Sequence, residues 1–131
     1  LGLEHETTRE AGTRAVLDGV AFALRDCRDA LAATGTRIDR LIALGGGSRS
    51  ETWLATIATA LGVPVDVPAA GDFGAAFGAA RLALMAATGA GPEIATPPPI
   101  ARRIAPIGDL TSAYDDAHAR FRAAARAIGS F

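Results

Sequence analysis

Three consecutive glycines stand where the main chain itself could bind a ligand. Gly45, Gly46 and Gly47 follow the apolar residues 41–44 and precede Ser48. Glycine carries no side chain and permits positive φ, so a flat ligand can lie directly against the backbone. A helix that begins just after such a turn offers free N–H groups and a partial positive charge. Together these features predict a nucleotide site.

The spacing of this run differs from the common phosphate-binding motifs. No Gly-Lys-Ser/Thr follows the glycines, as a Walker loop requires, and Gly-x-Gly-x-x-Gly does not match either. On spacing alone, a tight strand-to-helix turn without any ligand explains the glycines equally well.

A second group of small residues crowds one side of a helix predicted over residues 73–87. Glycine inside a helix costs about 1 kcal/mol relative to alanine. Two interior glycines therefore indicate close approach of a ligand or of another backbone, and helix packing without a ligand remains the alternative. The small residues are Gly71, Gly74, Ala75, Gly78 and Ala79.

The elements that position these residues alternate between helices and strands. Helices are predicted over residues 9–33, 48–61, 73–87 and 111–128, and strands over 38–44 and 63–67. Residues 88–106, with three prolines at 97–99, predict an irregular connection. The alternation predicts an α/β domain with a parallel sheet. Because two strands make a poor sheet, we expect other chain segments to complete it.

Two helices have recognisable details. Ser48 and Glu51 match a capping box, which predicts the start of the second helix. The first helix carries an apolar stripe on one face, and within it Cys27 is expected to be a small buried hydrophobe. The stripe consists of Val16, Val20, Ala23, Cys27 and Leu31. In the last helix the residues expected to face inward are Tyr114, Ala117, Phe121, Ala124 and Ile128.

Composition bounds the class of protein. The chain has 131 residues, half of them hydrophobic, and a net charge of -1. This length fits one domain, and the charge gives no electrostatic case for nucleic acid or an anionic membrane. No apolar run approaches the roughly 20 residues that span a bilayer. A cytoplasmic location is the default expectation.

The acidic and histidine side chains do not form a catalytic or metal-binding set. Asp72 precedes a helix, where an acid typically caps, and the pair Asp115–Asp116 lies where negative charge suits the helix dipole. His5 and His118 lack the spacing of metal ligands. We therefore assign no catalytic residue and no metal ligand to this chain.

Several segments jointly resemble the FGGY carbohydrate kinases, and among them most resemble the xylulokinases. The family shows a Gly-Gly-Gly-Ala-Arg-Ser-x-x-Trp segment with Gly-x-Pro-Val after it, as residues 45–53 and 62–65 nearly do here. The block 71–83 has the xylulokinase form, and residues 14–22 resemble the segment that ends in Arg-Ala-x-x-Glu-Gly. The resemblance covers about residues 1–87.

The resemblance implies a fold and a ligand. The fold would be part of an actin-like ATPase, with two ribonuclease H-like domains and ATP in the cleft between them, accompanied by Mg²⁺. Gly45, Gly46 and Gly47 would contact the adenosine, and Ser48 and Ser50 would lie beside the purine or ribose. Ser48 stands where alanine is commoner, so helix capping is its expected task.

One further position would serve the nucleotide. Asp18 replaces a glutamate of the family and would contact the ribose with a side chain that is one methylene shorter.

The resemblance also implies what this chain lacks. The family's Asp-x-Gly-Thr phosphate loop and its catalytic aspartate are not in the sequence. The whole enzyme would transfer the γ-phosphoryl group of ATP to D-xylulose, a pentulose bound mainly by an N-terminal region. Ribulose, gluconate or glycerol are alternative substrates, and a non-catalytic nucleotide-binding or assembly module is an alternative function. A homodimer is left open.

In this interpretation the chain has three parts. Residues 1–87 form the nucleotide-side core, 88–108 a Pro-rich connection and 109–131 a C-terminal helix.

Overall fold

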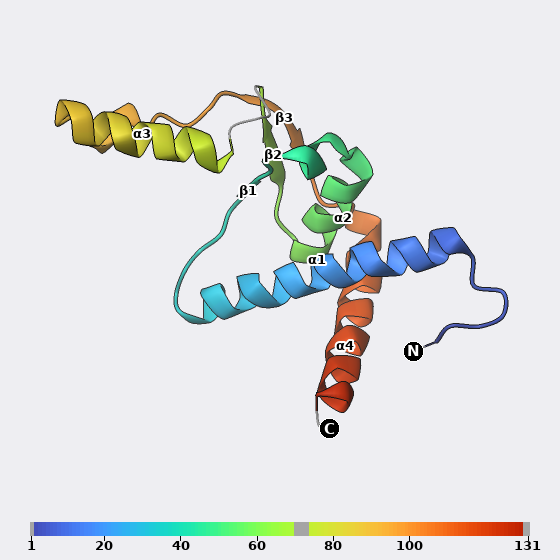
Figure 1. The fold of residues 1–131 in the computed structure, drawn as a ribbon. Coiled ribbons are helices and arrows are strands. Elements are labelled where there is room, and N and C mark those ends of the chain that lie inside the picture. Colours follow the sequence, from blue (N-terminus) through green and yellow to red (C-terminus); the bar gives the residue numbers. More distant parts are fainter. Residues whose placement is uncertain (1, 70–73, 130–131) are drawn as a thin grey trace.

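The computed structural model describes residues 2–69 and 74–129. Its elements follow the predicted order of helices and strands, with one added strand and three short 3-10 turns (Figure 1). The elements are α1 (Arg9–Ala33), β1 (Leu41–Ile42), η1 (Gly46–Arg49), α2 (Glu51–Leu61), β2 (Val65–Pro68), α3 (Ala75–Thr88), η2 (Pro92–Ile94), β3 (Ile100–Ile104), η3 (Gly108–Leu110) and α4 (Thr111–Ile128).

The sheet has three strands in the order β1-β2-β3. Strand β1 pairs with β2 in parallel, as predicted, with Leu41 opposite Val65. Strand β3 pairs with β2 in the antiparallel direction, with Val65 opposite Ile104. The sheet is therefore mixed, with β2 in its centre.

Strand β3 corrects the prediction that residues 88–106 are irregular throughout. The three prolines at 97–99 all precede this strand, so they remove no donor from its ladder. Residues 100–103 are exposed on both faces, which erases the alternation of apolar and polar residues that marks a half-buried strand. Pairing with β2 decides the conformation of this segment.

The core consists of two small clusters that share α2. One joins α1 to the end of α2 through Ala21, Phe22 and Leu61. The other joins α2 to the sheet through Leu54 and Val65. Helix α2 is thus the central element, with α1 crossing it on one side and the sheet on the other (Figure 1).

Helix α4 covers the first cluster with most of its predicted face. Tyr114, Ala117 and Phe121 pack against it, as expected, and Ala124 is half-buried. Ile128 is 62% exposed, so the prediction was wrong at this position. The helix extends past the core at its C-terminal end (Figure 1).

The apolar stripe of α1 is exposed, which corrects the prediction of a buried Cys27. Val16 is 67% exposed, Leu31 is 49% exposed, and Cys27 is also exposed. The helix uses Ala21 and Phe22 for its contacts with α2 and α4 instead. Two faces of α1 are apolar, and residues 2–69 and 74–129 cover only one of them.

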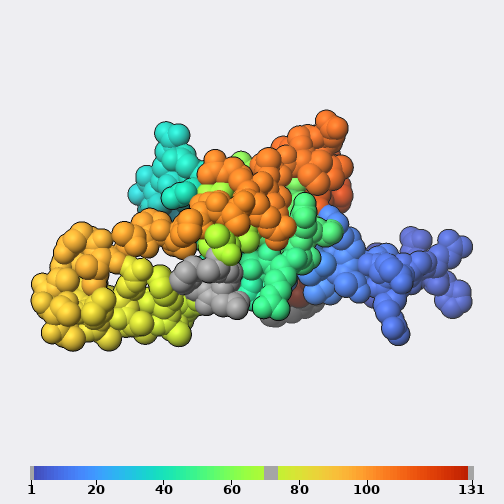
Figure 2. All heavy atoms as spheres, turned by 90° about the horizontal axis from the view of Figure 1, so that it is seen from above, coloured from blue at the N-terminus to red at the C-terminus, as the bar shows by residue number. Residues whose placement is uncertain are grey.

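Helix α3 stands away from α1, α2 and α4, and none of its residues is buried (Figures 1 and 2). It lies beside the segment that contains Pro97 and Pro98, and the two project together from one end of the molecule. Gly74 is its N-cap and Gly89, with φ 70°, its C-cap. The predictions for the start of this helix also concern Gly71, Asp72 and Phe73, which lie outside the described residues.

The carboxylate of Asp66 is fully buried in the central strand, and two arginines neutralise it. Arg103 donates from Nε at 2.6 Å and from Nη2 at 2.8 Å, and Arg40 donates from Nη1 at 3.3 Å. These hydrogen bonds, those from Arg103 above all, hold the pKa of Asp66 below its ordinary value against the opposing effect of burial. A buried charge needs such partners.

We expect the Asp66→Asn variant to unfold at lower urea concentration than the original chain at pH 7. A lowered folded-state pKa means that Asp66 stabilises the fold above its unfolded-state pKa and loses this effect as pH falls through the folded-state value. The difference between the two proteins should therefore shrink as the pH approaches 3. Urea unfolding from pH 7 to 3 measures it. Asp39→Asn, which removes an exposed partner of Arg37, is the control and should change little. A difference that does not depend on pH would contradict this account.

Candidate nucleotide-binding site

The glycine turn joins β1 to α2 through the 3-10 helix η1. Gly45 precedes it with φ 80° and ψ −170°, a conformation open essentially to glycine alone. The backbone N–H of Ser48 donates to the Gly45 carbonyl at 3.1 Å, and the Ser48 hydroxyl donates to the same oxygen at 2.7 Å. Ser48 is buried, so its side chain fastens the turn from within.

The capping residue of α2 is Ser50, which corrects the prediction that Ser48 caps this helix. The Ser50 hydroxyl accepts from the N–H of Trp53 at 3.3 Å. The 3-10 turn Gly46–Arg49, which contains two of the glycines, moves the capping position of α2 from residue 48 to residue 50. Glu51 then becomes the first helical residue, where a negative charge suits the dipole.

The three glycines of the turn have different reasons to be glycine. Gly45 needs its positive φ, and a Cβ on Gly47 would touch the Trp53 ring at 3.6 Å. Gly46 has no positive φ, and a Cβ there would meet nothing within 4 Å. A tight turn therefore explains Gly45 but not Gly46. Bare main chain beside open space is what a closely approaching ligand needs.

Gly46 and Gly47 are the first two residues of the 3-10 helix. The first N–H groups of a helix have no partner inside it, so these two amides can donate to an acceptor outside η1. The arrangement can hold an uncharged ring against the backbone and can hydrogen-bond acceptors at its edge.

The glycines of α3 are also next to open space. A Cβ on Gly74 or Gly78 would also meet nothing within 4 Å. Close helix packing within the described part of the chain therefore does not explain Gly78. Gly78 instead lines a hollow of about 380 Å³ that α3 shares with residues 95–98.

Asp18 lies in a different setting from the turn residues. Its carboxylate accepts from Nε of Arg14 at 2.9 and 3.0 Å and from the Tyr114 hydroxyl at 3.3 Å. The hydrogen bond to Asp18 raises the pKa of Arg14 above its ordinary value. Asp18 also lines a hollow between α1 and α4, together with Phe22 and Phe121. The predicted ribose contact of Asp18 stays a prediction.

A cleft of about 500 Å³ opens beside the first turn of α2. Its walls come from three parts of the chain, because α1, α2 and the segment that enters α4 meet there. Arg14, Glu51 and Tyr114 bring polar groups to it, and Ile107 and Leu110 bring apolar surface. The sequence analysis missed this cleft, since its residues lie up to a hundred positions apart.

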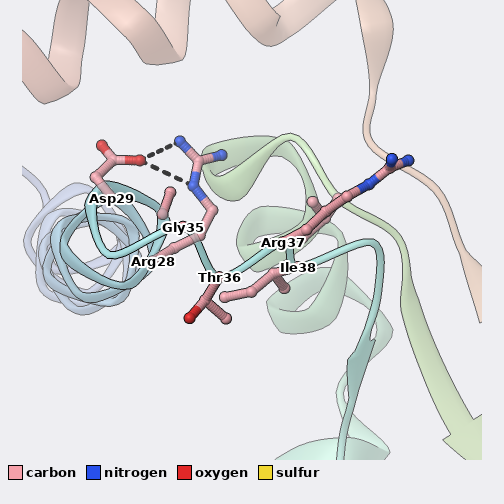
Figure 3. Close-up of a pocket in the computed structure, with 8 residues that line it drawn as sticks. Arg28, Asp29, Gly35, Thr36, Arg37 and Ile38 are labelled. Carbon is pink, nitrogen blue, oxygen red and sulfur yellow. Dashed lines mark hydrogen bonds and ion pairs between the residues drawn. The ribbon is translucent and has the colours of Figure 1, made fainter.

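A second hollow, of about 440 Å³, lies at the end of α1 (Figure 3). Its charged residues already have partners. Arg28 donates to the carboxylate of Asp29 and to the carbonyl of Leu61, and Arg37 donates to Asp39 at 2.6 Å. The contact of Arg28 with Leu61 connects α1 to the end of α2.

Arg102 is the site residue that sequence reasoning missed. Its Nη2 donates to the carbonyl of Ser48 at 3.1 Å, and its Nη1 lies 3.4 Å from a carboxylate oxygen of Glu51. The residue lies on β3, which the sequence did not predict. Without that strand nothing in the sequence connects position 102 to the turn.

Asp115 and His118 have structural partners. Asp115 accepts from Nη1 of Arg25 at 2.6 Å, and the buried ring of His118 lies with Nε2 2.9 Å from Asp26. Among residues 2–69 and 74–129, no three His, Cys, Asp or Glu side chains gather in a group that could hold a metal ion. No helix within the same ranges is long and apolar enough to cross a membrane.

The chain belongs to the FGGY family of carbohydrate kinases, whose C-terminal domain matches residues 1–87. The family assignment agrees with the fold. The α/β layout, with helices on a small mixed sheet, is that of one part of an FGGY sugar kinase, a class of enzyme with an actin-like ATPase fold.

Individual relatives point the same way. The chain is 43% identical over 86 residues to a xylulose kinase of Escherichia coli (strain K12), which is 66% of this chain and 18% of that protein. It is 42% identical over 83 residues to a glycerol kinase of Gloeobacter violaceus, which is 60% of this chain and 17% of that protein.

Two solved structures extend the likeness beyond residue 87. A xyloylose kinase from Brucella ovis matches 98% of this chain at 59% identity with a TM-score of 0.88. A xylulose kinase from Rhodospirillum rubrum matches 100% of it at 30% identity with a TM-score of 0.82. The chain spans 27% of each of those chains.

We expect Gly45→Ala and Gly46→Ala to affect folding unequally. Alanine at position 45 must adopt a backbone conformation that costs about 1–3 kcal/mol, whereas at position 46 it meets neither strain nor a neighbour. Urea unfolding of the two variants measures the difference. Equal losses of stability would contradict the assignment of strain to Gly45 alone.

Proposed function

We propose that this chain supplies the adenosine side of the ATP site in a sugar kinase that phosphorylates D-xylulose. The observation that carries the proposal is Gly46, a glycine that the turn does not need, where a Cβ would meet nothing within 4 Å. Membership of the FGGY family supports ATP as the nucleotide.

In this proposal the chain binds and orients the nucleotide, and other residues perform the transfer. The main chain of Gly45, Gly46 and Gly47 forms the surface on which the adenosine lies. Ser48 keeps that surface in shape from inside, and Ser50 caps α2 beside it. Phosphoryl transfer depends on positioning and on stabilisation of charge, so a fixed nucleotide floor is itself a contribution to the rate.

The described residues offer no catalytic base and no ligand set for Mg²⁺. We therefore propose that the metal is held with the phosphates outside this chain, and we assign the proton transfer from the sugar to residues outside it. ATP supplies the phosphoryl group. Asp18, held by Arg14 and Tyr114, is proposed to approach the ribose only at its edge.

The choice of xylulose over other acceptors follows the names of the Escherichia coli and Rhodospirillum rubrum relatives. The glycerol kinase of Gloeobacter violaceus, at 42% identity, is the specific observation that favours glycerol as a second candidate. The acceptor is therefore part of the test.

The test uses an intact kinase that carries this chain. The matching segment of the Brucella ovis enzyme is replaced by this chain, and the product is called here the composite kinase. We expect it to phosphorylate xylulose with ATP and to act on glycerol at a much lower rate, measured by coupled release of ADP. A composite kinase that folds, as circular dichroism shows, but transfers no phosphate to either acceptor would overturn the proposal.

We expect Gly46→Val in the composite kinase to raise KM for ATP about tenfold or more, equivalent to at least about 1.4 kcal/mol. The added side chain would occupy the space left for the nucleoside. KM for xylulose should change by less than about twofold. Gly12→Val is the matched control, because Gly12 is another glycine without positive φ and with nothing within 4 Å. Equal increases in both KM values would contradict the role of Gly46.

We expect the chain alone to bind ATP weakly, with Kd above about 1 mM. Only one wall of the proposed cleft is present in it, so most of the nucleotide would stay in water. Isothermal titration of the chain with ATP, beside the composite kinase, measures this difference. Micromolar binding by the chain alone would instead favour a self-sufficient nucleotide-binding module.

A further inference from the structure

Two adjacent arginines on β3 serve opposite faces of the sheet. Successive side chains of a strand point to opposite sides. Arg103 reaches the buried carboxylate of Asp66, and Arg102 reaches the turn between β1 and α2. The register of β3 on β2 places Arg102 opposite Val67 and Arg103 opposite Asp66. One strand thus connects the centre of the sheet to the candidate nucleotide site.

The contact of Arg102 with the turn is made to the main chain. Its Nη2 donates to the carbonyl of Ser48, a residue that is only 5% exposed. A hydrogen bond from a guanidinium to a carbonyl oxygen is charge-assisted and stronger than a neutral one. The second contact, with Glu51, joins side chains that are 41% and 77% exposed and contributes little by itself.

The contacts of Arg102 with Ser48 and Glu51 lie on the two sides of the junction between η1 and α2. Ser48 closes η1 onto the Gly45 carbonyl, and Glu51 is the first residue of α2. One guanidinium therefore connects the end of the turn to the start of the helix. The amides of Gly46 and Gly47 lie between Gly45 and Ser48, the two residues that the hydrogen bonds of Ser48 join.

We propose that Arg102 is a positioning residue for the nucleotide turn. It keeps the main chain of residues 45–48 in the shape that receives the adenosine, without touching the nucleotide itself. This inference rests on the proposed function. It also gives a task to a segment outside residues 1–87, the part of the chain that the family's C-terminal domain matches.

The test compares Arg102→Ala and Arg102→Lys in the composite kinase. We expect Arg102→Ala to raise KM for ATP about three- to tenfold while KM for xylulose and kcat at saturating ATP stay within about twofold. Lysine can make one of the two contacts but lacks the planar fork. Arg102→Lys should therefore restore part of the affinity for ATP.

The control is Arg37→Ala, which removes an exposed arginine with an exposed partner and should leave all three constants unchanged. If Arg102→Ala leaves KM for ATP unchanged while Gly46→Val raises it, this inference fails and the proposed function stands. If neither variant changes KM for ATP, both fail.

A general loss of folding would change KM for ATP and KM for xylulose alike, whereas a loss of positioning would change only KM for ATP. If Arg102→Ala does not fold, Arg102→Lys decides alone. A lysine variant with an unchanged KM for ATP, or with equal losses for ATP and xylulose, would overturn the positioning role.

Discussion

The buried carboxylate of Asp66 is the constraint on which the arrangement of this chain depends. A charge in the middle strand of a sheet must be paired, because burial without partners is very costly. Arg103 supplies most of the pairing, so β3 has to lie on β2 with these two residues opposite one another. A slip of one residue would turn Arg103 away and carry Arg102 off the turn. The ion pair inside the sheet and the contact with Ser48 are therefore consequences of one register.

Helix α2 connects the sheet to the rest of the molecule. It packs on β2 through Leu54 and Ala58 and on α1 through Ala60 and Leu61. Its first turn follows the glycine turn directly, is capped by Ser50 and is contacted by Arg102 through Glu51. An element buried on two sides is a rigid support, and a site placed at its start inherits that rigidity.

The exposed apolar surfaces agree with a chain that represents about a quarter of its solved relatives. Val16, Leu24 and Leu31 on α1 lie uncovered, as do Leu82 and Leu84 on α3. Large apolar side chains left exposed in this number mark places where other polypeptide can pack. A Cβ on Gly46 in the glycine turn likewise would meet nothing within 4 Å. This is why we assign to the chain the binding of one part of a nucleotide and no chemical step.

The sequence alone determined the local features. Helices, the parallel pair of strands and the glycine turn follow from apolar periodicity and glycine spacing, which act over a few residues. The family followed from motifs that are contiguous in the chain. Features that join distant residues could not be predicted from the sequence alone. The apolar stripe of α1 indicated a helix but could not tell which of two faces this chain covers.

Only the tertiary structure decided how the site is held. The capping residue moved from Ser48 to Ser50 because a 3-10 turn intervenes, and spacing does not distinguish the two serines. Strand β3 has no pattern of its own and exists because β2 offers it a partner. The pairing of Asp66 with Arg103, and the reach of Arg102 to Ser48, depend on that partner strand, since backbone pairing between distant segments leaves no periodic trace in the sequence.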